Sequence, residues 1–128
     1  MNKVVCVDFD GVIHRYRYGW SDGTIYDKPV SGCLSTMEEL QDHFDEVVIF
    51  STRAFDKTIN GVLQKNQIEE MREWLAYYNV PYSRIATEGK PIADYYIDDN
   101  AIRFESWNQT IADIAEHEGF TTKKENSY

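Results

Sequence analysis

The chain has 128 residues, which fits one domain of ordinary size and leaves no room for a second, substrate-binding domain. With 13 Lys and Arg against 22 Asp and Glu, the formal net charge is −9, which disfavours nonspecific binding to nucleic acid or to an anionic membrane. A ligand that carries phosphate therefore needs a local reversal of charge, from a metal ion or clustered cations. The uncharged apolar runs are only a few residues long, so we expect no transmembrane segment.

The amino terminus and the two cysteines both predict a cytoplasmic protein. Asp8 interrupts the first apolar run before the apolar core of a signal peptide could be completed. Cys6 and Cys33 lack the spacing of metal ligands, and we expect buried thiols rather than a disulfide. The expected organisation is one domain over residues 1–120, followed by a polar tail over residues 121–128.

Two short β-branched runs in the first half of the chain predict buried parallel strands. The run at residues 3–7 stops at acidic and glycine residues, and the run at 47–50 stops at Ser51. Between them, apolar residues recur at spacings of three and four, which indicates an amphipathic helix. These residues are Leu34, Met37, Leu40 and Phe44. The pattern predicts a β-α-β unit.

The second half of the chain repeats this alternation. Residues 68–78 carry a helical apolar face, residues 84–87 and 95–97 are typical of short strands, and a last helix is expected to start near Ser106 or Asn108. Strands that alternate with helices predict an α/β fold with a doubly wound parallel sheet at the centre of three layers, α/β/α. In such sheets, ligands bind beyond the carboxyl ends of the strands.

Two segments depart from the alternation. Residues 14–18 and 23–26 flank a polar turn and predict a hairpin that overhangs the strand ends. Its aromatic side chains, Trp20 among them, are suited either to stacking on a base or sugar or to packing against the domain. In residues 54–64, the turn signal Asn60-Gly61 predicts either a second small flap or a surface turn.

Polar side chains gather where the predicted strands end. Asp8-Phe9-Asp10-Gly11 directly follows the first strand, so both carboxylates leave the sheet at its rim. Alone, this motif also fits a solvated turn, whereas a calcium loop would need further acidic residues that are absent. The other predicted strand ends add a hydroxyl, a cation and an acidic pair, which are Ser51, Lys90 and Asp98-Asp99.

This order of motifs, over residues 3–104, resembles the haloacid dehalogenase-like (HAD) superfamily of phosphatases. The resemblance implies that Asp8 is the nucleophile, which attacks phosphorus and becomes an aspartyl phosphate. It implies that Asp10 is the general acid for the leaving alcohol and then the base for water. Lys90 would steady the nucleophile and the phosphate.

The same resemblance implies a substrate-binding set and a magnesium site. The substrate-binding residues would be Ser51, whose hydroxyl binds a phosphoryl oxygen, together with Thr52, Arg53 and Gly11. Mg²⁺ would be held by Asp8, the backbone carbonyl of Asp10 and the acidic pair, with Asp99 favoured over Asp98 as the direct ligand. The two charges of Mg²⁺ would convert the acidic cluster into a phosphate receptor. Crowding among carboxylates is expected to keep a proton on Asp10 near neutral pH.

The places where this superfamily inserts cap domains are short here. Residues 11–30 suffice for a flap only, so we expect no cap domain and an open rim. An open rim admits the end of a polynucleotide or a phosphoprotein, whereas a small nucleotide or sugar phosphate would need the flaps or oligomerisation to exclude water. The expected activity is Mg²⁺-dependent phosphomonoester hydrolysis, with a marginal preference for nucleotides or polynucleotide ends. The alternative is a catalytically silent phosphate- and metal-binding regulatory module of the same fold.

Overall fold

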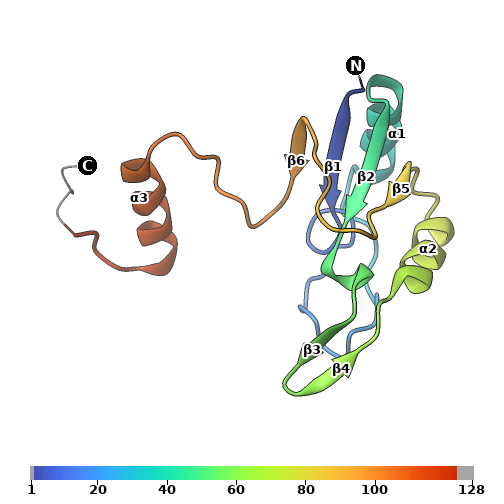
Figure 1. Ribbon diagram of the computed structural model, residues 1–128, viewed down its shortest axis with the longest axis horizontal. Coiled ribbons are helices and arrows are strands. Elements are labelled where there is room, and N and C mark those ends of the chain that lie inside the picture. The colour runs from blue at the N-terminus through green and yellow to red at the C-terminus, as the bar shows by residue number, and fades with distance from the viewer. Residues whose placement is uncertain (1, 124–128) are drawn as a thin grey trace.

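The structure, a computed structural model, describes residues 2–123. Residues 124–128 of the expected polar tail lie outside the described residues. Four parallel strands form the central sheet, in the order β5-β2-β1-β6 (Figure 1). Their bounds are Val4–Asp8 for β1, Glu46–Phe50 for β2, Arg84–Ile85 for β5 and Tyr95–Ile97 for β6. The predicted α/β class with a parallel sheet is confirmed.

The described residues form three α-helices, each close to its predicted position. The helix α1 follows β1, α2 precedes β5, and α3 follows β6. The last helix begins after Ser106, whose Oγ accepts a hydrogen bond from the Gln109 N–H at 3.1 Å, and ends at Gly119 with φ 78°. The helix bounds are Cys33–His43 for α1, Ile68–Tyr77 for α2 and Trp107–Glu118 for α3.

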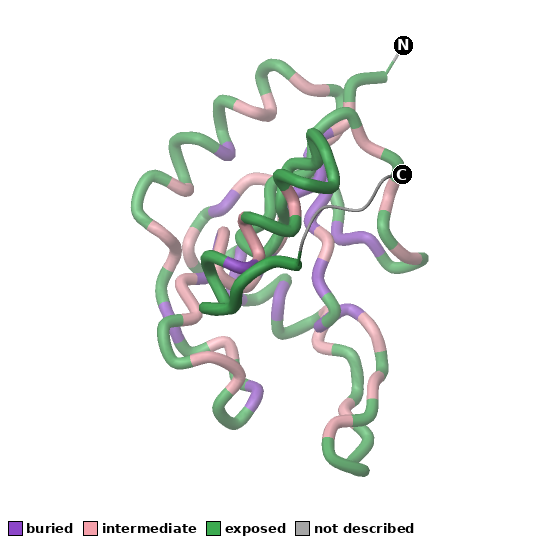
Figure 2. The backbone as a smooth tube through the Cα atoms, turned by 90° about the vertical axis from the view of Figure 1, so that its left-hand side faces the viewer, coloured by how far each residue is buried: buried purple, intermediate pink, exposed green. Residues whose placement is uncertain are grey.

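A single hydrophobic core lies between one face of the sheet and the first two helices. Alternate residues of β1 and β2 point to this face, and they pack against α1 and α2. The core residues contributed by these elements are Val5, Val7, Val47, Ile49, Met37, Met71, Trp74 and Leu75. In Figure 2, α3 lies nearest the viewer and exposed residues predominate along it, although Ala115 is buried.

The predicted three layers are not seen within the described residues. The connection from β5 to β6, residues 86–94, contains no helix, so it brings no helical layer to the second face of the sheet. The helix α3 stands apart from the sheet at the end of an extended segment, residues 98–106 (Figure 1).

The loop after β1 differs from the predicted hairpin. Residues 15–26 contain no strand, because the backbone repeatedly enters the left-handed region, which interrupts an extended ladder. The residues with positive φ are Tyr16, Gly19, Ser21 and Gly23. The loop is instead held by side chains: Arg17 Nη2 lies 3.0 Å from Asp27 Oδ1. The hairpin prediction for residues 14–26 is therefore wrong.

The segment around Asn60-Gly61 does form a hairpin. The strands β3 (Lys57–Ile59) and β4 (Val62–Gln64) pair antiparallel. Asn60 and Gly61 both have positive φ, 51° and 77°, as a tight two-residue turn requires. Of the two predicted alternatives, the small flap is therefore correct. It projects from the end of the molecule toward which β1 and β2 point (Figure 1).

The helices of the described residues are all too short and too polar to span a bilayer, in agreement with the expectation from the sequence. Both cysteines are free thiols, as expected, although only Cys6 is fully buried and Cys33 is half-buried. Burial raises the pKa of both thiols.

Candidate functional site

Three carboxylates meet where β1 and β6 end. Because Val7 pairs with Ile97, these neighbouring parallel strands finish at the same rim, and the chain then places Asp98 and Asp99 beside Asp8. One oxygen from each of the three side chains lies within 4.8 Å of the others. Asp8 is half-buried and the other two are exposed. Clustered carboxylate oxygens are the ligands that hard divalent cations such as Mg²⁺ prefer.

Gly11 leaves the space that Asp99 needs in this cluster. Its φ is +83°, and a Cβ built there would lie 2.1 Å from Asp99 Oδ2. Any other residue at position 11 would therefore collide with the Asp99 carboxylate. This close approach ties the turn after β1 to the end of β6, and the carboxylate set that results fits a divalent metal ion.

Burial is the largest influence on the Asp8 carboxyl. It raises the pKa of Asp8 to about 6, and the nearby charges of Asp98, Asp99 and Asp10 act in the same direction. The Phe9 N–H donates a hydrogen bond to Asp8 Oδ1 at 2.8 Å, which partly opposes this rise. A divalent cation among these carboxylates would favour the ionised form of Asp8.

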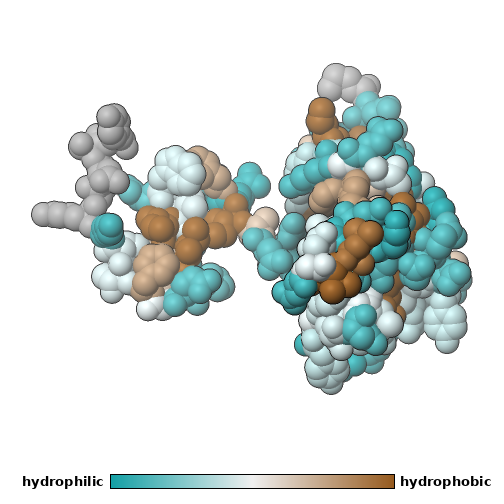
Figure 3. Space-filling model, turned by 60° about the horizontal axis from the view of Figure 1, so that its bottom comes forward, coloured by the Kyte–Doolittle hydropathy of each residue, from teal (hydrophilic) through white to brown (hydrophobic). Residues whose placement is uncertain are grey.

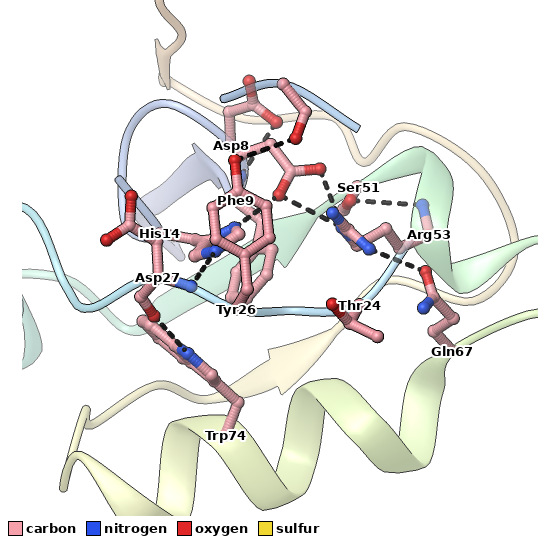
Figure 4. Close-up of polar contacts among 12 residues, drawn as sticks. Asp8, Phe9, His14, Thr24, Tyr26, Asp27, Ser51, Arg53, Gln67 and Trp74 are labelled. Carbon is pink, nitrogen blue, oxygen red and sulfur yellow. Dashed lines mark hydrogen bonds and ion pairs between the residues drawn. The ribbon is translucent and has the colours of Figure 1, made fainter. Parts of the chain in front are cut away.

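Asp10 contacts a cation and an imidazole. Figure 4 shows these two partners, Arg53 and His14, approaching from opposite sides of the site. Arg53 Nε donates to Asp10 Oδ2 at 2.8 Å and lies 3.1 Å from Oδ1, and His14 Nδ1 lies 2.9 Å from Oδ1. The hydrogen-bonding partners of Asp10 are therefore a guanidinium and an imidazole, while its charge also acts on the neighbouring Asp8 carboxyl. Arg53 reaches Asp10 because β2 is followed by a tight turn that directs Arg53 toward β1.

His14 holds Asp10 from a fully buried position. The Asp27 backbone N–H donates to His14 Nε2 at 3.0 Å, so Nε2 carries the lone pair and the proton is on Nδ1, facing Asp10. Phe9 and Trp74 pack against the ring, with centroid distances of 5.2 to 5.6 Å within this trio. No role for His14 was predicted from the sequence, and its spacing of four residues from Asp10 was the signal that could have found it.

Arg53, which the resemblance gave as a substrate-binding residue, is fully buried. Its Nη1 donates to the Gly23 carbonyl at 2.7 Å and to Gln67 Oε1 at 2.8 Å, while its Nη2 is buried without a partner. The Trp20 ring lies 4.7 Å from this guanidinium and 4.8 Å from Lys57 Nζ. Of the two alternatives for the aromatic loop, packing against the domain therefore describes Trp20.

Ser51 lies beside Asp8 on the adjacent strand end. Asp8 pairs with Phe50, so the next residue of β2 reaches the same rim. Ser51 is buried, and its Oγ accepts a hydrogen bond from the Arg53 N–H at 3.2 Å, which caps the short 3₁₀ turn η1 (Thr52–Ala54). The hydroxyl proton of Ser51 remains available to a phosphoryl oxygen. Thr52 is exposed at the start of this turn.

Lys90 lies near the rim but is directed elsewhere. Its Nζ is 4.5 Å from the centre of the Tyr96 ring, and Tyr96 pairs with Cys6, two residues before Asp8. The positive charge of Lys90 acts on the Cys6 thiol and lowers its pKa, against the larger effect of burial. Within the described residues Lys90 forms no ion pair with Asp8. Of the predicted catalytic residues, it is the one that the fold leaves outside the cluster.

The structure thus brings most of the predicted site together at one rim. The three acids that were predicted to bind metal converge with Gly11. Asp10 and Ser51 follow the two adjoining strands, and the buried Arg53 supports Asp10. Comparisons with family models, curated proteins and solved structures found no match to this chain.

Proposed function

We propose that this protein is a Mg²⁺-dependent phosphomonoester hydrolase that acts through an aspartyl-phosphate intermediate. The observation that supports this proposal is the convergence of Asp8 with Asp98 and Asp99 at the rim. A carboxylate nucleophile beside a metal-binding carboxylate pair and a hydroxyl is the set that phosphoryl transfer on aspartate needs. The proposal includes the HAD-like relationship, the three-layer fold and the absence of a cap domain.

Mg²⁺, held by Asp8, the main-chain carbonyl of Asp10 and the acidic pair, would supply the positive charge that admits a phosphate dianion. In the first step an Asp8 oxygen attacks phosphorus, the ester P–O bond breaks, and the leaving oxygen takes a proton from Asp10. In the second step Asp10 takes a proton from water, whose oxygen attacks the aspartyl phosphate and releases inorganic phosphate and the Asp8 carboxylate. The Ser51 hydroxyl donates to a phosphoryl oxygen throughout.

The contacts of Asp10 suit its part in the second step. Arg53 and His14 both contact its carboxyl oxygens and so fix its orientation at the rim. A carboxylate held in one orientation by two donors is positioned to receive a proton from water. The open rim supports a substrate as large as the end of a polynucleotide, and nucleotides are the first small substrates to test.

A second candidate is a phosphate- and metal-binding module without turnover. The specific observation in its favour is that Lys90 stacks on Tyr96 instead of pairing with Asp8. In this case the acidic cluster and Ser51 would still bind metal and phosphate, but the cation that steadies the nucleophile would be missing.

The test is hydrolysis of a panel of phosphomonoesters with Mg²⁺, including mononucleotides, sugar phosphates and oligonucleotides phosphorylated at either end. Asp8→Asn should lower activity by about a thousandfold or more, because it removes the nucleophile. Asp42→Asn, on the exposed side of α1, is the matched control and should leave activity unchanged. If Mg²⁺ with beryllofluoride raises the melting temperature while no ester is cleaved, the binding module is correct instead.

A further inference from the structure

Within the part of the chain that the structure describes, α3 stands away from the sheet and the other two helices and carries an apolar face (Figure 1). Trp107 and Ile111 are one turn apart and are 77% and 42% exposed. Ile114 follows on the same side of the helix. Phe104 packs on Trp107, with ring centroids 5.1 Å apart, and is itself exposed. Figure 3 shows this helix as a separate mass with apolar residues on its surface, joined to the body by a narrow connection.

The strand β6 leaves a matching apolar strip uncovered. Its residues Tyr95 and Ile97 are 59% and 39% exposed, although their register partners Val5 and Val7 on β1 are fully buried. The hydrophobic core therefore stops one strand short of the edge of the sheet. Phe44, at the end of α1, reaches only the Tyr95 ring, with a centroid distance of 5.9 Å. The strip continues the core and lacks only a covering element.

The solvent-accessible surface of the chain is larger than that of a compact monomer of the same mass. The chain exposes 9303 Å², whereas a compact monomer of 15.0 kDa exposes roughly 7,000 Å². The excess is on the order of 2,000 Å² per chain, so two chains that each bury it form an interface of on the order of 4,000 Å² in total, in the range of large homodimer interfaces. Two separated apolar surfaces of one chain account for an excess of this kind.

The segment that joins β6 to α3 runs away from the sheet. It comprises the nine residues 98–106, longer than the roughly two to six residues of most connections between strands and helices in α/β folds. It has no glycine, no proline and no residue with positive φ, and a local turn lies at its start, where the Asn100 N–H donates to Asp98 Oδ1 at 2.7 Å. Beyond this turn the segment runs away from the sheet (Figure 1). Fully extended, it reaches about 30 Å, enough to deliver α3 to a neighbouring molecule.

We propose that two copies of this protein exchange α3, so that the Trp107–Ile111 face of each helix covers Tyr95 and Ile97 on β6 of the other copy. A second copy is the occupant that satisfies both surfaces at once, because each chain offers the helix and also the strip. An unrelated partner would cover one of them and leave the other exposed. The exchange is closed by a two-fold axis, which is the commonest symmetry of soluble oligomers. The proposal does not depend on the proposed enzymatic activity.

The first test is the molar mass of the full chain, measured by light scattering after gel filtration and by sedimentation at several concentrations. We expect twice the chain mass of 15.0 kDa. Ile111→Glu should produce monomers. Leu63→Glu, at another exposed apolar site on β4, is the control and should remain dimeric. A monomer at every concentration, or a dimer that Ile111→Glu leaves intact, would overturn the proposal.

The second test separates exchange from return of α3 to its own sheet. The double variant Tyr95→Cys/Ile111→Cys is oxidised and examined on a non-reducing gel, with Leu63→Cys/Ile111→Cys as the control. Exchange yields a covalent dimer in the first variant and not in the second. A disulfide within one chain, or no cross-link, contradicts the exchange. Circular dichroism of each variant verifies that the helices are retained.

Discussion

The body of the molecule and α3 follow the same local rules but differ in burial. In the body, α1 and α2 acquire their stability from a shared core with β1 and β2. The helix α3 has a serine cap, a glycine end and an apolar face of its own, yet its apolar face remains exposed. The comparison shows that capping and periodicity determine where a helix forms, whereas the packing of a helix depends on distant surfaces.

Among substitutions that test this comparison, we expect the largest loss of unfolding free energy at Arg53, inside the body. Arg53→Ala leaves the Asp10 carboxylate without its cation and removes the bonds to Gly23 and Gln67. Loss of one partner from a buried ion pair typically costs about 3 kcal/mol or more of unfolding free energy. Arg72→Ala removes an exposed pair with Glu69 on α2 and should cost less than about 1 kcal/mol. Urea denaturation measures both, and equal losses would contradict the structural role of Arg53.

The next effect compares a core leucine with an isoleucine of α3. Leu75→Ala opens a cavity in a fully buried site and should cost about 3 kcal/mol. Ile111→Ala should cost less than about 1 kcal/mol when the protein is dilute and monomeric, because this side chain then touches little. Thermal unfolding at low and high protein concentration measures both. A large loss for Ile111→Ala at low concentration would show that α3 packs on its own chain.

The last effect is the pH dependence of the unfolding free energy, to which Asp8 and Asp27, both in the body, contribute with opposite sign. The raised pKa of Asp8 means that the folded state binds a proton more tightly than the unfolded state. The free energy of unfolding of the metal-free protein should therefore fall as pH rises from about 4 to about 6. Asp8→Asn should remove this slope, and Asp42→Asn should retain it.

Asp27 contributes in the other direction. Hydrogen bonds from Arg17 hold the pKa of Asp27 well below its usual range. Its contribution to stability is complete above the ordinary pKa of an aspartate and is lost as pH falls toward its lowered value. Arg17→Met should therefore make acid unfolding begin at higher pH, measured by circular dichroism. An unchanged acid transition in this variant would show that the pair contributes nothing to stability.

Much of the body could be predicted from the sequence because its signals are local. The β-branched runs of β1 and β2 and the spacing of Met37 and Leu40 on α1 specify their elements without reference to the rest of the chain. The common rim then follows from the geometry of parallel strands, since residues after β1, β2 and β6 emerge at one edge. The position of the carboxylate cluster could be predicted from the sequence for this reason.

The remaining features depend on contacts between distant segments. The burial of Arg53 requires the Gly23 carbonyl and Gln67, and the burial of His14 requires the Asp27 N–H, none of which a spacing pattern reveals. The loop at residues 14–26 was misread because left-handed conformations at Tyr16 and Ser21 are rare for such residues. The separation of α3 from the sheet could not be predicted, because its capping residues and apolar spacing indicate a helix whether or not that helix packs on the sheet.

The close approach of Gly11 and Asp99 couples two positions that are far apart in the sequence but adjacent at the rim of the sheet. A methyl group at position 11 would push the acidic side chain outward, so a new residue there is tolerable only together with a shorter or displaced one at position 99. Engineering this carboxylate cluster for a larger or softer ion should therefore vary both positions in the same library, because a larger residue at position 11 also moves the side chain at position 99.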